Sequence, residues 1–394
     1  MGRNGSNDWK TSQLGDVIEL FDYQRVPLNS RERQERQGEY PYYGAQGIID
    51  HIDGYIFDGR FILVAEDGEN LNSKKLPLAL FATEKFWVNN HAHILRGKFD
   101  VADDTFLLAC LNNADIKPFV TGAAQPKLSQ ANLRQIEIPL PPLPVQRRIA
   151  GILSAYDELM ENSQRRIRVL EAMARSLYRE WFVHFRFPGH EKLPRVASPL
   201  GDIPQGWEMK KLGDLISYNR RATKPGPHLD ERKYVPIDCL PSKSLALLEA
   251  KPIEEAQSSL QLFEKGDILF GAMRPYFHKV VVAPFAGVTR TTCFVFKPAQ
   301  PEWYAFATMT AFEEATVAHA NAHSQGATIP YAVWGGSLAE MPLVLPPDAL
   351  LRRFEKVVAP MLARISQSFF TLNNLHRTRD LLLPRLLSGQ VNLG

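Results

Sequence analysis

The 394-residue chain carries 46 lysines and arginines against 43 aspartates and glutamates, so we expect at least two domains and only local basic patches for any nucleic acid. Its three cysteines, Cys110, Cys239 and Cys293, are far apart and outside any metal-binding spacing, which indicates reduced thiols in a cytoplasmic protein. No apolar run approaches the roughly 20 residues that span a bilayer, and no signal-peptide segment follows Met1, so we expect no membrane association.

The first globular segment, residues 1–143, is predicted to be rich in strands. Four strand signals, separated by Asp-Gly turns, lie at residues 47–51, 55–57, 61–64 and 93–95. Residues 106–111 favour a helix, and Ser129 suits the N-cap of a short helical turn. The alternating apolar residues at 136–140 predict a last strand before a proline cluster ends it.

A long helix is predicted over residues 144–187. Apolar residues recur at alternating spacings of three and four with charges between them, the pattern of a helix that packs against another helix. The predicted packing positions are Ile149, Leu153, Tyr156, Met160, Ile167, Leu170, Leu177 and Trp181. Pro144 suits the first turn, and the helix is expected to end near Phe187.

A second helix with the same apolar spacing is predicted over residues 346–394. Adding 205 to the numbers of the first series gives Phe354, Val358, Met361, Ile365, Leu372, Leu375, Leu382 and Leu386. Asp348 is predicted as the N-cap, and Pro360 and Pro384 are predicted to kink the helix or fray its end. The chain therefore supplies both helices of an intramolecular coiled coil.

The globular segments repeat as well. Trp9 opens the stretch WKTSQLGDVIEL and Trp207 opens WEMKKLGDLISY, an offset of 198. Because the offset between the helices is 205, the length variation lies within the globular parts. We predict an α+β fold with a pseudo-twofold repeat, in which residues 1–143 and 188–345 form two strand-rich mixed domains and residues 144–187 and 346–394 form the long helices.

Four stretches resemble the specificity subunit of Type I restriction-modification systems. They are GDVIEL, YPYYGAQGIIDHIDGYIFDGRFILVAEDG, QPKLSQANLRQIEIPLPPLPVQRRIAGIL and LLLPRLLSGQV. The resemblance covers nearly the whole chain, and the order of the stretches together with the duplication makes it specific. It implies two target-recognition domains, held apart by antiparallel helices, that bind double-stranded DNA at a split site.

The resemblance also implies partners and a fixed spacing. Two methyltransferase subunits, each with S-adenosylmethionine, and restriction or motor subunits that use ATP and Mg²⁺ would assemble on this chain, which would itself hold no cofactor. Thirty-three residues of helix span about 50 Å. That length corresponds to one to one and a half turns of DNA, so the helices would fix the length of an unread gap between two half-sites.

The residues themselves indicate no catalytic site. The sequence has no glycine-rich cofactor loop followed by a base-holding Asn/Asp-Pro-Pro-Tyr/Phe segment, and no phosphate-binding loop of an ATPase. His91 and His93 either chelate a metal or lie on one face of a strand, and we favour the strand. His319 and His323 have helical spacing, but Ala320 occupies the place of a zinc protease's glutamate, so we predict no metal site.

Candidate DNA-binding residues are polar or basic side chains and glycines on predicted loops, because such groups reach base edges and phosphates. The first domain offers Tyr43, Gly44, Gln46, Gln125 and Lys127. The second domain offers Arg220, Arg221, Lys224, Arg274, Ser324, Gln325 and Thr328. In the alternative interpretation the tyrosines belong to the core and the arginines to a solvated face. The different content of the two domains predicts two different half-sites.

A second function remains open at this point. A non-DNA coiled-coil scaffold that joins two protein-binding domains would show the same helical periodicity. Salt-dependent binding to duplex DNA separates the two hypotheses, because phosphate contacts release counterions.

Overall fold

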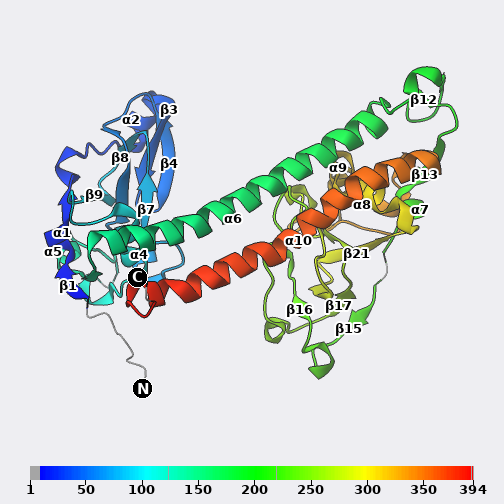
Figure 1. The fold of residues 1–394 in the computed structure, drawn as a ribbon. Coiled ribbons are helices and arrows are strands. Elements are labelled where there is room, and N and C mark those ends of the chain that lie inside the picture. Colours follow the sequence, from blue (N-terminus) through cyan, green and yellow to red (C-terminus); the bar gives the residue numbers. More distant parts are fainter. Residues whose placement is uncertain (1–8, 123, 219, 392, 394) are drawn as a thin grey trace. The chain divides into compact units, whose positions relative to one another are not determined.

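A computed structural model of the chain describes residues 9–122, 124–218, 220–391 and 393. The chain divides into two compact units. Unit 1 comprises Met1–Glu158 and His376–Gly394, and unit 2 comprises Leu159–Leu375. Each unit thus combines one globular part with a stretch of each long helix (Figure 1). The predicted mixture of helices and strands with two long helices is confirmed.

The first long helix ends slightly earlier than predicted. Helix α6 (Leu143–Tyr178) continues as one wider π-helical turn, Arg179–Val183. Phe185 adopts a φ of 58°, the left-handed conformation that terminates helices. The helix therefore stops at Val183 and not near Phe187.

The second long helix is α10 (Asp348–Leu387), and its start corrects the predicted N-cap. Asp348 is its first residue and not the residue that precedes it, and the Asp348 carboxylate accepts a hydrogen bond of 3.2 Å from Trp303 Nε1. The helix also runs through Pro360 and ends only three residues after Pro384. Both prolines are exposed, so water can satisfy the carbonyls that each proline leaves without a backbone partner.

The two long helices pack antiparallel. In unit 1, Ile149 near the start of α6 shares a hydrophobic core with Leu386 near the end of α10. In unit 2, the ring centroids of Trp181 and Phe182 lie 5.7 and 4.8 Å from that of Phe354, near the start of α10. Each predicted packing position is buried or half-buried.

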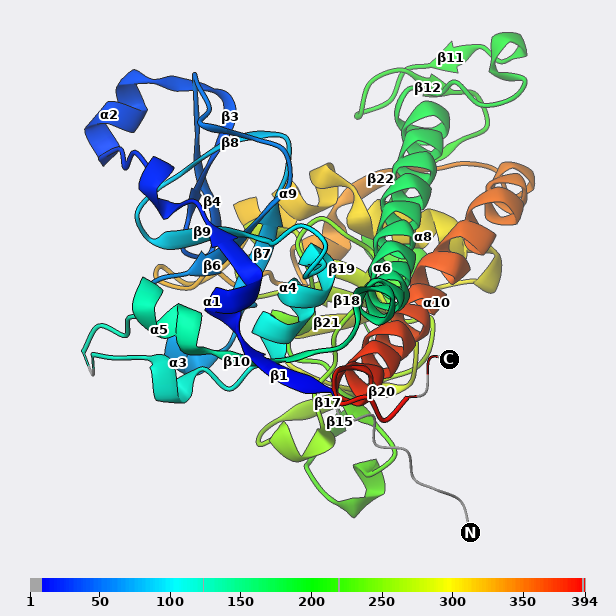
Figure 2. The same ribbon diagram turned by 60° about the vertical axis from the view of Figure 1, so that its left-hand side comes forward.

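In the described residues, unit 1 contains two four-stranded sheets and one strand pair. The first sheet has the order β2 (Ile18–Leu20), β9 (Ala92–Gly97), β6 (Phe61–Ala65), β7 (Ala79–Ala82). The second has the order β4 (Gly47–Ile52), β3 (Gln37–Gly44), β8 (Lys85–Val88), β5 (Phe57–Asp58). Strand β1 (Lys10–Gln13) pairs with β10 (Glu137–Leu140), beside which it lies in Figure 2. The strands predicted at 47–51, 61–64, 93–95 and 136–140 are confirmed, and the one at 55–57 is shifted to β5.

Short helices complete unit 1. They are α1 (Leu14–Val17), α2 (Ser30–Glu35), α3 (Asn70–Ser73), α4 (Asp104–Asn113) and α5 (Gln130–Gln135). The helix predicted at 106–111 is α4. Ser129 caps α5 as predicted, because its side chain accepts a hydrogen bond from the Asn132 backbone N–H.

Unit 2 repeats this architecture. One sheet has the order β14 (Ile216–Tyr218), β21 (Cys293–Pro298), β18 (Ile268–Gly271), β19 (Val280–Val282). The other has the order β15 (Ala222–Thr223), β17 (Leu260–Phe263), β20 (Gly287–Arg290), β16 (Lys233–Tyr234). The remaining elements include β11 (Arg195–Val196), β12 (Ile203–Pro204), β13 (Glu208–Lys211), β22 (Pro342–Leu345), α7 (Leu212–Leu215), α8 (Tyr304–Phe312) and α9 (Glu314–Ala322).

The duplication read from the sequence is confirmed at the level of strand register. Lys10 faces Leu140 across β1 and β10, and Glu208 faces Leu345 across β13 and β22. These pairs differ by 198 and 205 residues, the two offsets found in the sequence. Among the residues that the structure describes, no helix is both long and apolar enough to cross a membrane.

Candidate nucleic-acid interface

In unit 1, the loop at residues 121–128 closes on itself as a tight turn. The backbones of Thr121 and Lys127 exchange two hydrogen bonds, of 2.9 and 2.8 Å. Gly122 has a φ of 85°, and a Cβ placed there would lie within van der Waals overlap of the Gln125 carbonyl oxygen, at 2.4 Å. Glycine is therefore the residue that this turn requires. Ala123 lies outside the described residues.

This turn is fastened to a second loop, residues 66–68, which follows strand β6. The Gly68 N–H donates to the Pro126 carbonyl at 3.2 Å, and the Leu128 N–H donates to the Glu66 carbonyl at 2.8 Å. We call the two joined loops, residues 66–68 and 121–128, the paired-loop frame of unit 1.

Unit 2 contains an equivalent paired-loop frame, made of residues 272–274 and 325–332. Its four backbone hydrogen bonds correspond to those of unit 1. Gln325 and Tyr331 exchange two bonds that close the turn, Gln325 N to Tyr331 O at 2.8 Å and Tyr331 N to Gln325 O at 2.7 Å. Two more join the turn to the second loop, Arg274 N to Pro330 O and Ala332 N to Ala272 O, both at 2.8 Å. Gly326 has a φ of 102°, and a Cβ there would lie 2.5 Å from the Ile329 carbonyl oxygen. The same backbone device thus occurs once in each unit.

The frame of unit 1 gathers three of the predicted DNA-binding residues. Gln125 and Lys127 lie in the turn and are exposed. Gln46 is also exposed, and its Nε2 would lie 3.9 Å from a Cβ built at Gly68. The Lys127 ammonium lies 3.2 Å from Glu66 Oε1, so part of its charge is already balanced.

Tyr43 and Gly44 lie away from this exposed group. The Tyr43 ring packs edge-on against Phe86 at 5.6 Å, and burial raises the pKa of Tyr43. Gly44 is buried, where a Cβ would lie 3.1 Å from Ile49. These two residues support the β3–β4 strand pair. This agrees with the alternative interpretation, in which the tyrosines belong to the core.

The frame of unit 2 contains Arg274, Gln325 and Thr328, and Ser324 directly precedes it. Gln325 and Thr328 are exposed, and Ser324 and Arg274 are half-buried. Arg274 adopts a φ of 50°, which is unusual for a residue with a side chain and costs roughly 1 kcal/mol or more. Its matching residue in unit 1 is Gly68, with a φ of 105°. The chain therefore holds an arginine in a backbone conformation that suits glycine.

The other three predicted residues of unit 2 lie around strand β15. Arg221 is 3.2 Å from Glu264 and 3.9 Å from Asp267, so its charge is balanced within the fold. Arg220 and Lys224 are exposed. The structure does not bring these residues to the paired-loop frame.

A buried polar network stands behind the frame of unit 1. His93 is 1% exposed, with Nδ1 2.6 Å from Asp22 Oδ2 and Nε2 2.8 Å from the Leu128 carbonyl oxygen. Arg25 Nη1 donates to Glu66 Oε2 at 2.7 Å. The network therefore ties the turn that carries Lys127 to strand β9 and to the loop before α2.

The acids of this network are held ionised. Burial alone would raise the pKa of Asp22, but the hydrogen bond and charge of His93, the Ile94 N–H and the charge of Arg25 together leave that pKa below its usual value. Burial also favours a higher pKa for Glu66. Hydrogen bonding to Arg25 opposes burial, and the pKa of Glu66 is lowered overall.

Asp22, Glu66 and His93 bring potential ligand atoms within 4.8 Å of one another, a spacing compatible with a metal ion. The positive charges of Arg25 and Lys127 already balance Glu66, and both ring nitrogens of His93 have oxygen partners. The charge of the cluster is therefore compensated by the protein's own side chains.

Acid is expected to destabilise unit 1 through this network. Because the folded-state pKa values of Asp22 and Glu66 lie below the ordinary values of 3.8 and 4.5, their contribution is complete at neutral pH. It falls once the pH drops below those ordinary values and is lost below the folded-state values. Urea unfolding at pH 6 and pH 3.5 measures this loss. Asp22→Asn should show a smaller pH dependence than the wild type, and an equal dependence would exclude Asp22 as a source.

The other histidine pair lies on and after α9, where His319 is half-buried and His323 is exposed. The rings of His319 and His323 stack at 4.1 Å, and His323 Nδ1 lies 2.9 Å from the His319 carbonyl oxygen. This contact is a local interaction at the end of the helix.

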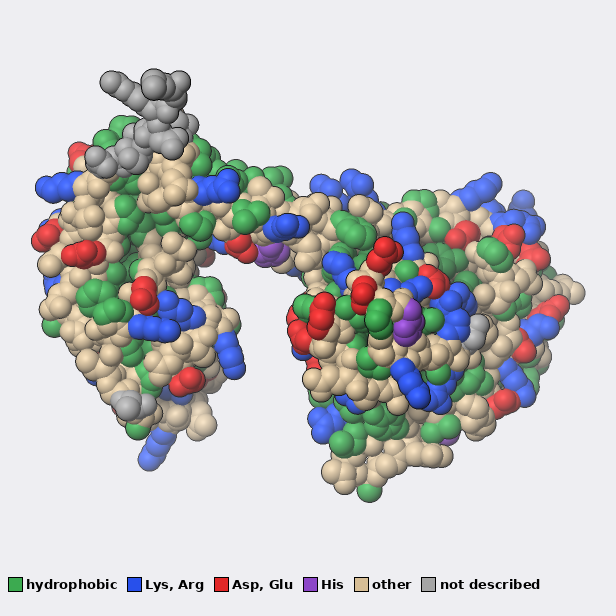
Figure 3. All heavy atoms as spheres, turned by 90° about the horizontal axis from the view of Figure 1, so that it is seen from below, with side chains coloured by type: hydrophobic (Ala, Val, Ile, Leu, Met, Phe, Trp, Pro, Cys, Tyr) green, Lys and Arg blue, Asp and Glu red, His purple; other side chains and the backbone are tan. Residues whose placement is uncertain are grey.

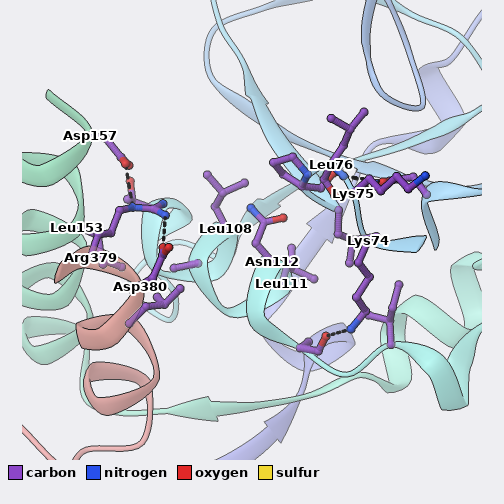
Figure 4. A pocket seen from close by; sticks show the side chains of 18 of the residues that line it. Lys74, Lys75, Leu76, Leu108, Leu111, Asn112, Leu153, Asp157, Arg379 and Asp380 are labelled. Carbon is purple, nitrogen blue, oxygen red and sulfur yellow. Dashed lines mark hydrogen bonds and ion pairs between the residues drawn. The ribbon is translucent and has the colours of Figure 1, made fainter. Parts of the chain in front are cut away.

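A pocket of about 690 Å³ lies between α4 and the two long helices of unit 1 (Figure 4). Arg379 lies 2.9 Å from Asp157 and 3.8 Å from Asp380, and Lys74 Nζ donates to the Ala114 carbonyl at 3.2 Å. Leu76, Leu108 and Leu111 contribute apolar walls. The helices are coupled to the globular part of unit 1 by the hydrophobic core that Leu153 and Leu386 share with Leu107 and Leu111.

Charge is mixed over the face drawn in Figure 3. Lysines and arginines alternate there with aspartates and glutamates instead of forming one continuous field. This agrees with the net charge of +3 and with basic contacts confined to local sites.

Residues 6–172 match the family model described as the Type I restriction modification DNA specificity domain. The chain is also 30% identical over 266 residues to a type I restriction enzyme specificity subunit from Haemophilus influenzae, across 67% of this chain and 65% of that protein. Residues 6–172 therefore belong to the Type I restriction-modification specificity family.

Other members of the specificity family align over more of the chain. The EcoDI specificity subunit from Escherichia coli is 21% identical over 415 residues, across 98% of this chain and 89% of that protein. A crystal structure of the Type I S subunit from M. genitalium matches with a TM-score of 0.63 at 15% identity and covers 98% of each chain, which shows the shared fold. The match spans slightly less than two thirds of the first two curated relatives, 65% and 66% of their lengths.

The sequence alone did not predict that the loop at residues 66–68 belongs to a candidate DNA-binding site of this specificity-family fold. Asp67-Gly68 read only as a turn. In the structure, Asp67 forms a bridge with Lys127 just as Met273 does with Tyr331. A repeat offset of 206 aligns the two loops, close to the offsets of 198 and 205 already visible.

Proposed function

We propose that this chain recognises double-stranded DNA at a bipartite sequence, with one half-site read by the paired-loop frame of each unit. The observation that carries the proposal is one backbone frame, built twice, that presents different side chains. Glycine at position 68 stands where unit 2 has Arg274, and Gln125 stands where unit 2 has Ile329. Equivalent scaffolds with unlike side chains suit two readers of unlike sequences.

In this proposal the chain is a non-catalytic subunit. Methyl transfer with S-adenosylmethionine belongs to two methyltransferase subunits, and ATP- and Mg²⁺-dependent cleavage belongs to restriction subunits. Support for docking on the helices comes from Leu159, Val169 and Met173, which are 52%, 49% and 46% exposed on one side of α6. Exposed apolar side chains grouped on one helix face favour a protein partner.

The affinity of the complex for duplex DNA as a function of salt tests the proposal. We expect the logarithm of the association constant to fall linearly with the logarithm of salt concentration, because phosphate contacts release counterions. Binding without salt dependence, or no binding in the presence of the methyltransferase subunits, would favour the protein scaffold instead.

Lys127→Ala and Gln125→Ala separate two kinds of contact in unit 1. Lys127→Ala is expected to weaken binding to all sequences by a few-fold and to reduce the salt slope by about one. Gln125→Ala is expected to relax one half-site, with a loss of about 1–3 kcal/mol in discrimination. Arg31→Ala provides the control, because Arg31 is exposed on α2 and pairs with Glu35. Unchanged affinity and methylation pattern in both variants would remove these residues from the interface.

A further inference from the structure

A second basic site lies on helix α6 within unit 2. A pocket of about 370 Å³, which we call the α6 pocket, is lined chiefly by Arg168, Glu171, Arg175, Arg179 and Lys243. Spacings of seven and four residues place the three arginines on one face of the helix. Lys243 reaches the same pocket from the loop between β16 and β17.

The cations of the α6 pocket are only partly balanced. Arg179 lies 2.6 Å from Glu313 and 3.6 Å from Glu314, and the Arg175 guanidinium stacks over the Phe312 ring at 4.9 Å. By contrast, Arg168 and Lys243 are exposed and form no ion pair with any residue in the described part of the chain.

The single acid of the pocket wall does not neutralise this excess. Glu171 is buried, and its Oε1 accepts hydrogen bonds of 2.7 Å from Ser244 Oγ and from the Leu245 N–H. The Glu171 carboxylate thus anchors the loop that carries Lys243 through these two hydrogen bonds. The open part of the pocket is left with a net positive charge.

The α6 pocket is physically joined to the paired-loop frame of unit 2. His278 Nε2 donates to the Phe312 carbonyl at 2.8 Å, and the Lys243 N–H donates to the His278 carbonyl at 2.8 Å. His278 ends the turn that begins at Arg274, and both residues have a φ of 50°. A strained turn of five residues therefore connects the frame to the pocket.

That connecting turn exposes aromatic side chains. Tyr276 and Phe277 are 50% and 43% exposed, with ring centroids 4.7 Å apart, and Ile329 in the frame is 41% exposed. Aromatic rings interleaved with arginine and lysine are typical of nucleic-acid surfaces. Such exposed aromatic rings are less suited to binding an acidic protein segment.

We propose that the α6 pocket binds a backbone phosphate of the DNA beside the half-site read by unit 2, an inference that rests on the proposed function. Arginine and lysine are the preferred phosphate ligands, and such contacts fix the register of a protein on DNA without reading sequence. The pocket positions the duplex, and the frame attached to it through His278 reads the bases.

The test uses the whole chain assembled with its methyltransferase subunits. The double variant Arg168→Gln, Lys243→Gln removes the two unpaired cations, and Arg165→Gln, Arg166→Gln removes two exposed cations of α6 that do not line the pocket. We expect the first variant to bind duplex DNA about tenfold more weakly at near-physiological salt, with a salt slope smaller by about two and an unchanged methylated sequence. The control should keep the wild-type slope.

Three results would overturn the proposal. An unchanged salt slope in the pocket variant would show that no phosphate is bound there. Loss of subunit assembly with normal DNA binding would identify the pocket as a docking site for an acidic protein segment. A wild-type complex that binds no DNA would instead refute the proposed function, and this inference with it.

Discussion

Replacing Phe354 with alanine is expected to lower the free energy of unfolding of unit 2 by about 3–5 kcal/mol. Phe354 is fully buried, and its ring lies 4.8 Å from that of Phe182 and 5.7 Å from that of Trp181. The truncation opens a cavity where the end of α6 meets the start of α10. Urea unfolding followed by tryptophan fluorescence measures the change.

Val357→Ala is the matched control for Phe354→Ala. Val357 lies on the same turn of α10 but is 43% exposed, so its truncation should change the free energy of unfolding by no more than about 0.5 kcal/mol. Equal effects of the two substitutions would mean that the helix contact does not support unit 2.

A four-residue insertion in both long helices is expected to lengthen the unread gap by about one or two base pairs. Ser163 and Ser368 are equivalent sites, because Ser163 Oγ donates to the Leu159 carbonyl at 2.8 Å and Ser368 Oγ donates to the Arg364 carbonyl at 3.0 Å. Four residues add about 6 Å to each helix. Inserting after both serines keeps the antiparallel register, and mapping methylated sites measures the gap.

The same insertion after Ser163 alone should abolish assembly. It shifts Ile167, Ala174 and Tyr178, all buried, by one turn against an unchanged α10. An unaltered gap with full activity in the paired variant would show that the helices set no distance.

The long helices could be predicted because their packing repeats at a local spacing. The heptad pattern alone identified Phe354 and Val358, which are fully buried. It missed Phe369, which is also buried, because Phe369 packs against Phe285 of the globular part at a centroid distance of 4.9 Å. Contacts between residues so distant in sequence follow no local period.

The site was predictable only in part for the same reason. Gly122 and Gly326 make the same turn, and their separation of 204 residues is close to the repeat offsets of 198 and 205, so the repeat relates them. It did not reveal that residues 66–68 complete the frame, because that link consists of backbone hydrogen bonds between distant loops. Arg221 looked like a free cation in the sequence, whereas the fold balances it with Glu264.

Helix α2 was missed although its signal was present. The Asn29 side chain accepts hydrogen bonds from the Arg31 and Glu32 N–H groups, and the Glu32 carboxylate accepts a hydrogen bond from the Asn29 N–H. This capping box is visible in the sequence as an asparagine followed three residues later by a glutamate.

The most direct test of the account is a genome-wide map of methylated adenines made by the complex with the wild-type chain and with Arg274→Ala. We expect a bipartite methylated sequence for the wild type. In the variant, the half-site of unit 2 should relax while the other half-site and the gap stay the same. A continuous methylated sequence, or a change in both half-sites together, would contradict the claim that two equivalent frames each read one half.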